Sequence, residues 1–260
     1  MTICQNCETV VDGKFCSQCG QKANVKRITT RAIFSDFIKK ITLWDKGLLY
    51  TTVQLMKSPG KMARAYLKGK RVNFTKPLNY ILIIVAISVL FFPRNDLDEA
   101  MSGMNNNLAR SSWYSDWIFS NITVIYVMMI PFLALVSRWF NKKADVNYAE
   151  QFVFYCYLMA GCTIVTIPFT VTLNLLHISA LTLGPIGILQ YMCWFLFFAW
   201  GYVQFFNKQR SYWGGIQGVL VLLIAYIIYI FVFGLLLGLA IFIAKVLFEI
   251  DLVPLSKPVQ

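Results

Sequence analysis

The amino-acid sequence predicts an all-α polytopic membrane protein with five transmembrane helices. Of its 260 residues, 58% are hydrophobic and only 14% are charged, a composition too apolar for a soluble globular domain. The net charge of +12 is concentrated before the first apolar segment, where Lys and Arg outnumber the acids by 15 to 4 over residues 1–76. This concentration argues against a nucleic-acid-binding chain as a whole and indicates a basic segment beside the membrane.

Four of the seven cysteines lie close together at the start of the chain. They are Cys4, Cys7, Cys16 and Cys19, in the spacing C-x2-C-x8-C-x2-C. Two C-x2-C hooks can bring four thiolates to one tetrahedral ion, which predicts a structural Zn²⁺ site, one ion per chain, in a zinc ribbon over residues 1–24. Because so short a segment cannot bury a core, the metal is expected to supply most of its folding free energy, on the order of 10 kcal/mol.

Two other uses of these cysteines compete with the zinc site. A C-x2-C pair can be a redox dithiol, but here a second pair follows and no βαβ pattern surrounds either one. A disulfide scaffold does not suit a reducing cytosol, where we expect the amino terminus to stay. Gly20 after the second hook suits the sharp turn of a thiolate hook, whereas Glu8 after the first suits it less.

Residues 25–76 are predicted to form a basic cytosolic connector of amphipathic helices. Apolar residues recur at helical spacing over residues 31–44 and again over residues 46–57. The apolar set of the second helix is Leu48, Leu49, Val53, Leu55 and Met56. A third helix is marked by Ser58 as its cap, by Pro59 in its first turn and by Gly69 after its last residue. Its expected apolar side consists of Met62, Ala63, Tyr66 and Leu67.

Basic residues on this third helix are expected to form a surface for anionic lipid headgroups or for a partner. They are Lys61, Arg64, Lys68, Lys70 and Arg71. At about 1 kcal/mol per basic residue near a charged leaflet, such a set can hold an amphipathic helix at the interface. The alternative is that these charges only follow the positive-inside rule and bind nothing in particular.

Three further patterns carry a resemblance to a known family. They are F-C-x-x-C-G-Q over residues 15–21, K-G-L-x-x-T over residues 46–51, and P-G-x-x-x-R-x-Y-x-x-G-K-R over residues 59–71, followed by P-x-x-Y over residues 77–80. In these patterns the chain resembles a family of uncharacterised bacterial membrane proteins, a domain of unknown function with a zinc ribbon and carboxyl-terminal transmembrane helices. The resemblance covers residues 1–80. It implies a bacterial inner-membrane protein and no established activity.

Five apolar segments make up the predicted membrane domain, residues 77–260. They lie at about residues 77–92, 118–140, 152–176, 186–206 and 216–246. Each can cross a hydrocarbon core of about 30 Å, although the first is short. The Lys and Arg residues of alternate loops predict a multi-pass protein with its amino terminus in the cytoplasm and its carboxyl terminus in the periplasm.

The last apolar segment contains a G-x-x-x-G pattern at Gly234 and Gly238. Small residues at this spacing permit close approach of two helices. The pattern predicts either packing inside the chain, which we favour, or a homo-oligomer.

Catalytic motifs are absent from the sequence. It contains no P-loop, G-x-S-x-G, H-E-x-x-H or dinucleotide fingerprint, and no apolar segment has an acid or Arg in its middle. We therefore expect no enzyme, and no catalytic or organic-cofactor site.

Two functional hypotheses remain. The first is a non-enzymatic inner-membrane adaptor or accessory subunit, which docks a membrane-complex partner, such as a secretion or translocation component, or a ribosome, through its zinc ribbon and basic face. Ribosome or RNA contact is included because small basic zinc ribbons also suit phosphate backbones. The second is a small-solute transporter or channel with the ribbon as a regulatory element.

Overall fold

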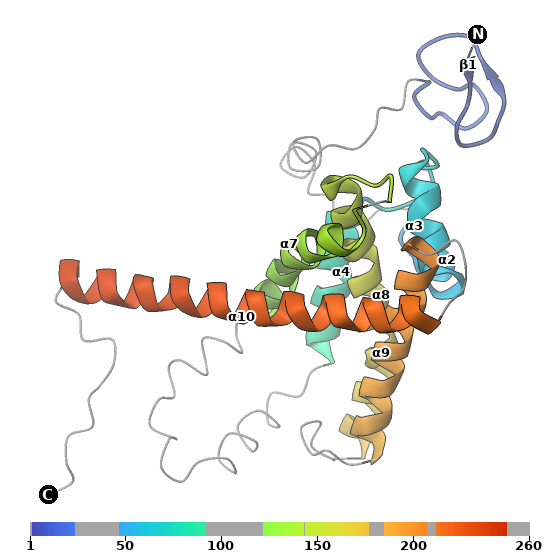
Figure 1. Cartoon of the computed structure of the whole chain (residues 1–260). Helices are drawn as coiled ribbons and strands as arrows, with labels where there is room; N and C mark the ends of the chain where they lie inside the picture. Colours follow the sequence, from blue (N-terminus) through green and yellow to red (C-terminus); the bar gives the residue numbers. More distant parts are fainter. Residues whose placement is uncertain are drawn as a thin grey trace, which may run out of the picture.

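The computed structural model describes residues 2–23, 47–91, 122–142, 144–176, 185–206 and 212–248. Within these residues a two-stranded ribbon is followed by seven helices, labelled in Figure 1. The elements are β1 (Thr2–Ile3), β2 (Val10–Val11), α2 (Leu48–Lys57), α3 (Pro59–Leu67), α4 (Pro77–Leu90), α7 (Ile122–Phe140), α8 (Tyr148–Leu175), α9 (Pro185–Phe206) and α10 (Tyr212–Phe248). The amphipathic helix predicted over residues 31–44 lies outside the described residues.

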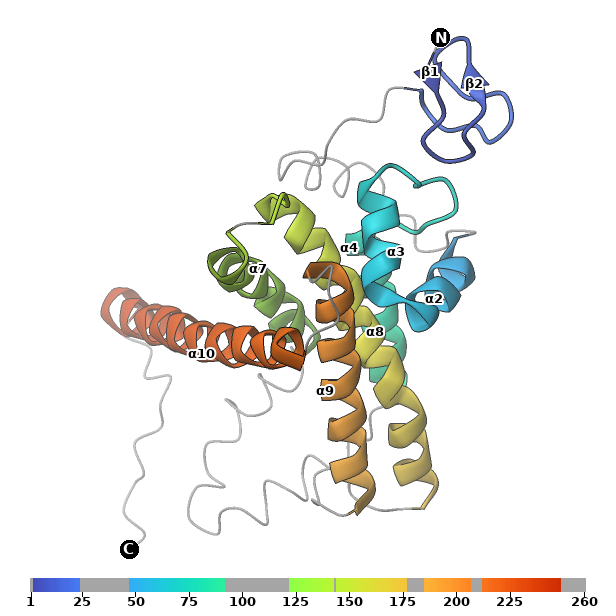
Figure 2. The ribbon, with the colours of Figure 1, turned by 45° about the vertical axis from the view of Figure 1, so that its right-hand side comes forward.

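The ribbon, residues 2–23, is a small unit beside the end of α3 (Figures 1 and 2). Its strands β1 and β2 pair antiparallel, with Thr2 opposite Val11 and Ile3 opposite Val10. The buried core of the ribbon consists of Cys4, Val11 and Cys16. A core of this size contributes little hydrophobic free energy, which is the condition under which small domains depend on a metal or a disulfide.

Helix α2 confirms the predicted second amphipathic helix, but its apolar set is divided. Leu55 is buried in the bundle core, whereas Leu49 and Val53 are exposed. Thr51 fixes the start of the helix, because its hydroxyl donates to the Gly47 carbonyl at 2.8 Å and accepts from the Thr75 amide at 2.9 Å. The threonine thereby ties α2 to the segment that leads into α4.

Helix α3 begins at Pro59 and ends before Gly69, as the sequence predicts. Ser58 stands at its N-cap but makes no side-chain hydrogen bond with the helix. At the other end the Gly69 amide donates to the Tyr66 carbonyl at 3.1 Å and the Lys70 amide donates to the Ala65 carbonyl at 3.0 Å. These two hydrogen bonds form a Schellman motif. Gly69 has φ +109°, a conformation that favours glycine at this position.

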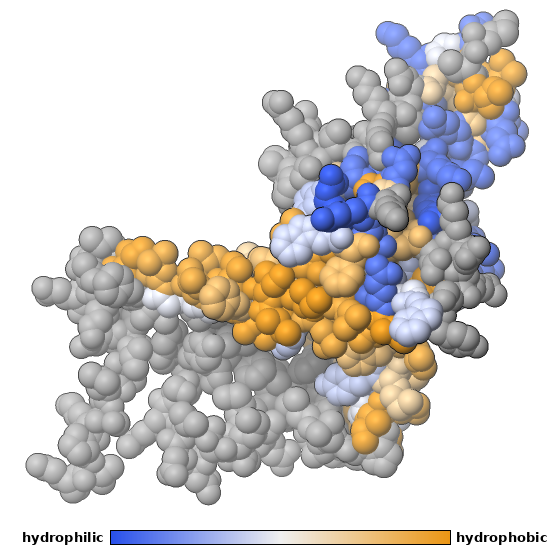
Figure 3. All heavy atoms as spheres, in the orientation of Figure 1, coloured by the Kyte–Doolittle hydropathy of each residue, from blue (hydrophilic) through white to orange (hydrophobic). Residues whose placement is uncertain are grey.

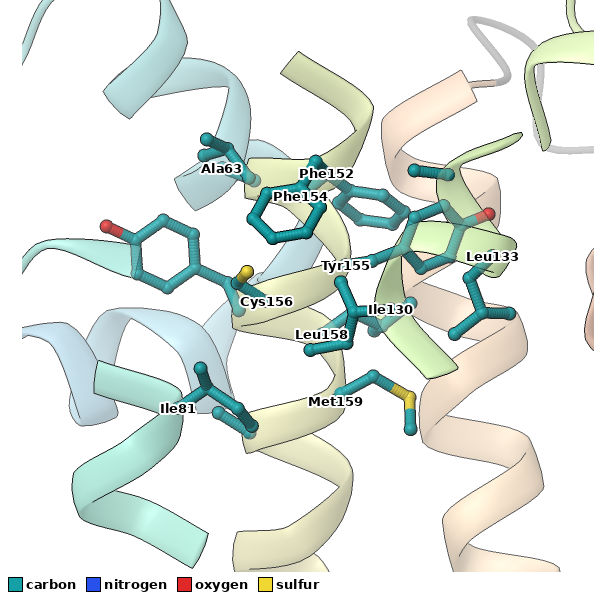
Figure 4. Packing of buried hydrophobic residues seen from close by; sticks show 14 of the residues in the cluster. Ala63, Ile81, Ile130, Leu133, Phe152, Phe154, Tyr155, Cys156, Leu158 and Met159 are labelled. Carbon is teal, nitrogen blue, oxygen red and sulfur yellow. The ribbon is translucent and has the colours of Figure 1, made fainter. Parts of the chain in front are cut away.

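Helix α8 is the central element of the helical bundle. All side chains over residues 152–160 are buried, and α3, α4, α7 and α9 pack around the helix. Figure 4 shows Phe154, Tyr155 and Cys156 of α8 pointing toward different neighbouring helices. A reciprocal capping box starts α8. The side chains of Asn147 and Glu150 each accept a hydrogen bond from the other residue's backbone amide at 2.8 Å.

Three helices of the described residues are long and apolar enough to cross a membrane, which indicates a membrane protein. They are residues 148–173 of α8, 186–206 of α9 and 213–236 of α10. The prediction of five spans is not supported, because α4 has only 14 residues, about 21 Å of helix, and the apolar stretch described in α7 is also short. The sequence showed where the apolar residues lie but not where each helix ends.

Helix α10 is 37 residues long, crosses α9 and extends beyond the bundle (Figures 1 and 2). Its visible surface is mostly hydrophobic in Figure 3. Apart from its chain neighbours and the nearby backbone of α10 itself, no atom of the described residues would lie within 4 Å of a Cβ added at Gly234 or Gly238. The G-x-x-x-G pattern therefore makes no close helix contact in the described part of this chain, contrary to the packing inside the chain that we favoured.

Candidate metal centre

The four amino-terminal cysteines converge on one point. Their sulfur atoms all lie within 4.8 Å of one another, with Cys4 3.5 Å from Cys19 and Cys7 3.5 Å from Cys16. Four thiolates about 2.3 Å from a tetrahedral Zn²⁺ would be about 3.8 Å apart. The sulfur positions fit a metal ion of this kind, and all four residues are those that the sequence predicts.

The two hooks have the same backbone hydrogen bonds. In the first, the Glu8 amide donates to the Cys4 carbonyl at 2.9 Å and the Cys4 amide donates to the Thr9 carbonyl at 2.9 Å. In the second, Gly20 donates to Cys16 at 2.8 Å and Cys16 donates to Gln21 at 2.7 Å. The hooks therefore present their cysteines to the site in equivalent ways.

Both hooks also place one residue in the left-handed conformation. Gly20 has φ +71° and Glu8 has φ +64°. Glycine adopts this conformation freely, whereas a residue with a Cβ loses about 1 kcal/mol there. This conformation is the physical reason why Glu8 suits its hook less than Gly20 does.

The thiol groups differ in their acidity. Hydrogen bonds with the side chain and backbone of Thr9 lower the pKa of Cys7 to about 6. Backbone amides of Cys7 and Asn6 lower the pKa of Cys4. For Cys19 a backbone hydrogen bond at Gln21 acts downward, but burial and the other three cysteines together raise its pKa to about 11. The first hook favours thiolates, and the charge of a bound cation would favour them in both hooks.

The other three cysteines do not belong to this site. Cys156 and Cys162 are buried in α8 and Cys193 is partly buried in α9, which agrees with their interpretation as small apolar residues.

The five predicted basic-surface residues fall into two groups. Lys61, Lys68 and Lys70 are exposed. Arg64 donates from Nη2 to the Phe205 carbonyl near the end of α9, and its guanidinium lies 5.7 Å from the Phe205 ring centroid. Arg71 is only partly exposed as well, and its contacts are described below. The two arginines hold parts of the chain together, which charge counting could not distinguish from a surface role.

Helix α3 lies so close to the end of α9 that there is no room for a side chain at Gly60. A Cβ added at Gly60 would lie 2.5 Å from the Gln204 Cβ and from the Phe205 amide nitrogen. The Gly60 amide also donates to Gln204 Oε1 at 3.2 Å. The P-G-x-x-x-R part of the motif over residues 59–71 therefore packs α3 onto α9.

A contact that the sequence analysis missed joins the ribbon to the turn after α3, residues 68–71, which we call the α3 turn. Gln21 donates from Nε2 to the Gly69 carbonyl at 2.7 Å and accepts at Oε1 from the Arg71 amide at 3.3 Å. Both residues of the turn and Gln21 belong to the patterns that carried the family resemblance, but no local pattern connects positions 48 residues apart.

The fold and the site define a mostly helical membrane protein with an amino-terminal ribbon that can hold a metal ion. Residues 45–89 match the family described as "Protein of unknown function (DUF3667)". The match covers α2, α3 and nearly all of α4, and leaves the ribbon and the later helices outside it. No curated protein and no solved structure matches the chain.

Proposed function

We propose that this chain is a non-enzymatic adaptor or accessory subunit of the bacterial inner membrane, in which a Zn²⁺-loaded ribbon docks a protein partner. One observation carries the proposal: the four-cysteine ribbon is seated on α3 while large apolar side chains on its surface are exposed. A seated ribbon meets a partner in one orientation, which lowers the entropy lost on binding. The long apolar helices hold the ribbon at a membrane.

The apolar side chains of the ribbon are the proposed contact with the partner. Ile3 and Val10, which face each other across the strand pair, are 67% and 58% exposed, and Phe15 is 56% exposed. Figure 3 shows hydrophobic surface on this part of the molecule. Three exposed apolar side chains are many for a unit of this size. They favour a protein partner with an apolar surface.

In the described part of the chain, the ribbon and α3 differ in net charge. The charged side chains of the ribbon balance one another, and they are Glu8, Asp12, Lys14 and Lys22. Residues 47–91 contain no acid, so the exposed Lys61, Lys68 and Lys70 form a purely cationic face. We assign this face to anionic lipid headgroups, at about 1 kcal/mol per basic residue.

The adaptor test is purification of the tagged full chain from its native membrane with identification of co-purifying proteins. Exchanging Ile3, Val10 and Phe15 together for Ser is expected to remove a stoichiometric partner while zinc stays bound. The matched control exchanges Leu49 and Val53, which are exposed on α2, for Ser and keeps the partner. A homo-oligomer with no other protein, unchanged by the ribbon substitutions, would contradict the adaptor proposal.

Among the described residues, ribosome contact would involve α3 and the α3 turn rather than the ribbon, because the charges of the ribbon balance whereas α3 and its turn are cationic. Salt-sensitive co-sedimentation with ribosomes that is lost in a Lys61→Glu, Lys68→Glu, Lys70→Glu variant would make RNA the partner. Binding to vesicles that contain phosphatidylglycerol, with no co-sedimentation, is the result expected for a lipid-facing surface.

The proposed topology keeps the amino terminus in the cytoplasm and the carboxyl terminus in the periplasm, with five crossings. This requires the short apolar segment over residues 77–92, which contains the 14 residues of α4, to cross the membrane. A reporter active only in the periplasm, inserted between residues 100 and 101, is expected to be active. An inactive reporter there would leave α4 on the cytoplasmic side and rule out five spans.

A small-solute transporter or channel is the second candidate, and one observation favours it. Gln151 Oε1 and the Tyr155 hydroxyl are buried in the bundle without a hydrogen-bond partner among the described residues. Buried polar atoms are normally paired, and a polar solute passing the bundle would pair with these two. A Gln151→Leu, Tyr155→Phe variant that loses function in cells while keeping its partner would favour transport, whereas full function would favour the adaptor.

A further inference from the structure

The ribbon binds the α3 turn through the amide nitrogen and the amide oxygen of one buried side chain, Gln21. The Gln21 amide donates to the Gly69 carbonyl and accepts from the Arg71 amide, and the Gln21 side chain is only 6% exposed. A primary amide that pairs with a carbonyl and an amide two residues apart imitates the pairing of a neighbouring strand. Such a contact fixes both the position and the orientation of the ribbon on the turn.

The first hook contacts the same turn through Gln5. A Cβ added at Gly69 would collide with the Gln5 side chain, so the hook lies directly against the glycine. Gln5 stands between the cysteines of the first hook, and Gln21 is two residues beyond the last cysteine of the second. The α3 turn is therefore contacted by Gln5 of the first hook and by Gln21, which follows the second hook.

The two hooks are joined to each other by few other contacts. The ribbon core is limited to Cys4, Val11 and Cys16 with their partly buried neighbours, and Thr9 and Gln18 share a side-chain hydrogen bond on the exposed side. Four metal–thiolate bonds would connect the hooks far more strongly than these contacts do. Gln5 and Gln21 reach Gly69 together only while the hooks are held at this spacing.

The α3 turn is in turn connected to the core of the bundle. Arg71 donates from Nε to the Tyr66 carbonyl at 3.3 Å and lies over the Tyr66 ring, 5.5 Å from its centroid. Tyr66 packs edge-on against Tyr157 of α8, with ring centroids 5.5 Å apart. The α3 turn is therefore linked through Tyr66 to the central helix of the bundle.

We propose that the metal ion and the α3 turn bind the ribbon cooperatively, so that metal loading seats the ribbon on α3 and release of the metal detaches it. The inference rests on the metal site of the proposed function and adds a regulatory role to it. Linkage makes the coupling reciprocal: if the metal strengthens seating, seating strengthens metal binding by the same factor. The α3 turn, which supplies no ligand, is then a determinant of metal affinity.

The test uses the full chain in lipid nanodiscs and compares Gly69→Ala with a matched control, Lys70→Arg. Alanine at position 69 must displace Gln5 and adopt φ +109°, whereas Lys70 is exposed and keeps its charge as arginine. Zinc affinity is measured by competition with a chromophoric chelator. We expect affinity to fall about tenfold in Gly69→Ala, the effect of one lost polar contact, and to stay unchanged in Lys70→Arg.

Hydrogen exchange of peptides that contain Arg71 reports the other half of the coupling. Exchange is expected to be about tenfold faster in Gly69→Ala, and also in the unaltered chain after zinc is removed by a chelator. Gln21→Ala provides a second variant that leaves α3 intact, and its metal content is expected to stay at one ion per chain. Gln18→Ala, the same exchange on the exposed side of the ribbon, is expected to leave the turn protected.

Two negative results are distinguishable. If the purified chain binds no zinc under any of these conditions, the metal site fails and the coupling fails with it. If the chain binds zinc but Gly69→Ala and Gln21→Ala both keep the affinity and the exchange rates of the unaltered chain, the coupling alone is overturned.

Discussion

The described ribbon buries only Cys4, Val11, Cys16 and Gln21, whereas α8 buries every residue from 152 to 160. In the ribbon, a few sulfur atoms that meet at one point determine the fold. In the bundle, many large side chains contribute, such as Phe154, which stacks on Phe205 with ring centroids 4.0 Å apart. We therefore expect that loss of one group abolishes the fold of the ribbon, while the bundle loses stability in proportion to what is removed.

Loss of one metal ligand is expected to have the greatest effect on the ribbon. Cys16→Ser is expected to remove most of the metal's contribution to folding of the ribbon, on the order of 10 kcal/mol, and to reduce bound zinc to near zero. Zinc content by atomic absorption and the helical signal in circular dichroism measure the two regions separately. A variant that keeps one zinc per chain would contradict the four-thiolate site, and loss of the helical signal would contradict the independence of the bundle.

A core substitution tests the opposite region. Phe154→Ala is expected to destabilise the bundle by about 3–5 kcal/mol, because a large buried ring is replaced by a cavity. Its zinc content should not change. Phe231→Ala on the exposed side of α10 is the control, since Phe231 is 70% exposed. Thermal unfolding in detergent distinguishes them, and equal midpoints for the two variants would count against α8 as the centre of the core.

A smaller effect is expected from one buried hydrogen bond. The Tyr157 hydroxyl donates to the Thr75 carbonyl at 2.6 Å in a buried position between α8 and the start of α4. Tyr157→Phe leaves that carbonyl unpaired and should cost about 1–3 kcal/mol of bundle stability. Tyr226→Phe at an exposed position of α10 serves as control. An unchanged unfolding midpoint for Tyr157→Phe would show that the carbonyl finds another donor.

The smallest effect concerns the backbone of the ribbon. Glu8→Gly removes the strain of a left-handed residue and should stabilise the loaded ribbon by about 1 kcal/mol, while Gly20→Ala should destabilise it by a similar amount. Chelator competition is expected to rank zinc affinity as Glu8→Gly, unaltered chain, Gly20→Ala. The reverse order would mean that the Glu8 side chain contributes more to the site than its backbone conformation costs.

Local features of this protein were predictable from its sequence. The four cysteines were predictable as metal ligands from their spacing, because a tetrahedral site needs only short hooks that any chain can form. Pro59 and Gly69 marked the two ends of α3 for the same reason, since each acts on its own backbone. Met62, Ala63 and Tyr66 were also found as the buried side of α3, because a helix repeats every 3.6 residues whatever it packs against.

Contacts between distant residues were not predictable. Gln21 and Gly69 are 48 residues apart, and Arg64 and Phe205 are 141 residues apart. A single sequence shows that Arg64 is basic but not that a helix end lies beside it to accept its hydrogen bond. The structure does not support five spans for a related reason, since apolar composition alone does not show that α4 ends at Leu90.

The burial of α8 places a demand on the synthesis of the protein. Of the helices packed around it, α3, α4 and α7 precede it in the chain, whereas α9 follows it. At about 5–20 residues per second, the ribosome needs roughly 2–6 s to complete α9 after it finishes α8. During that interval the face that will meet α9 has no protein partner from its own chain. Until α9 has been made, lipid or the insertion machinery must cover this apolar face of α8.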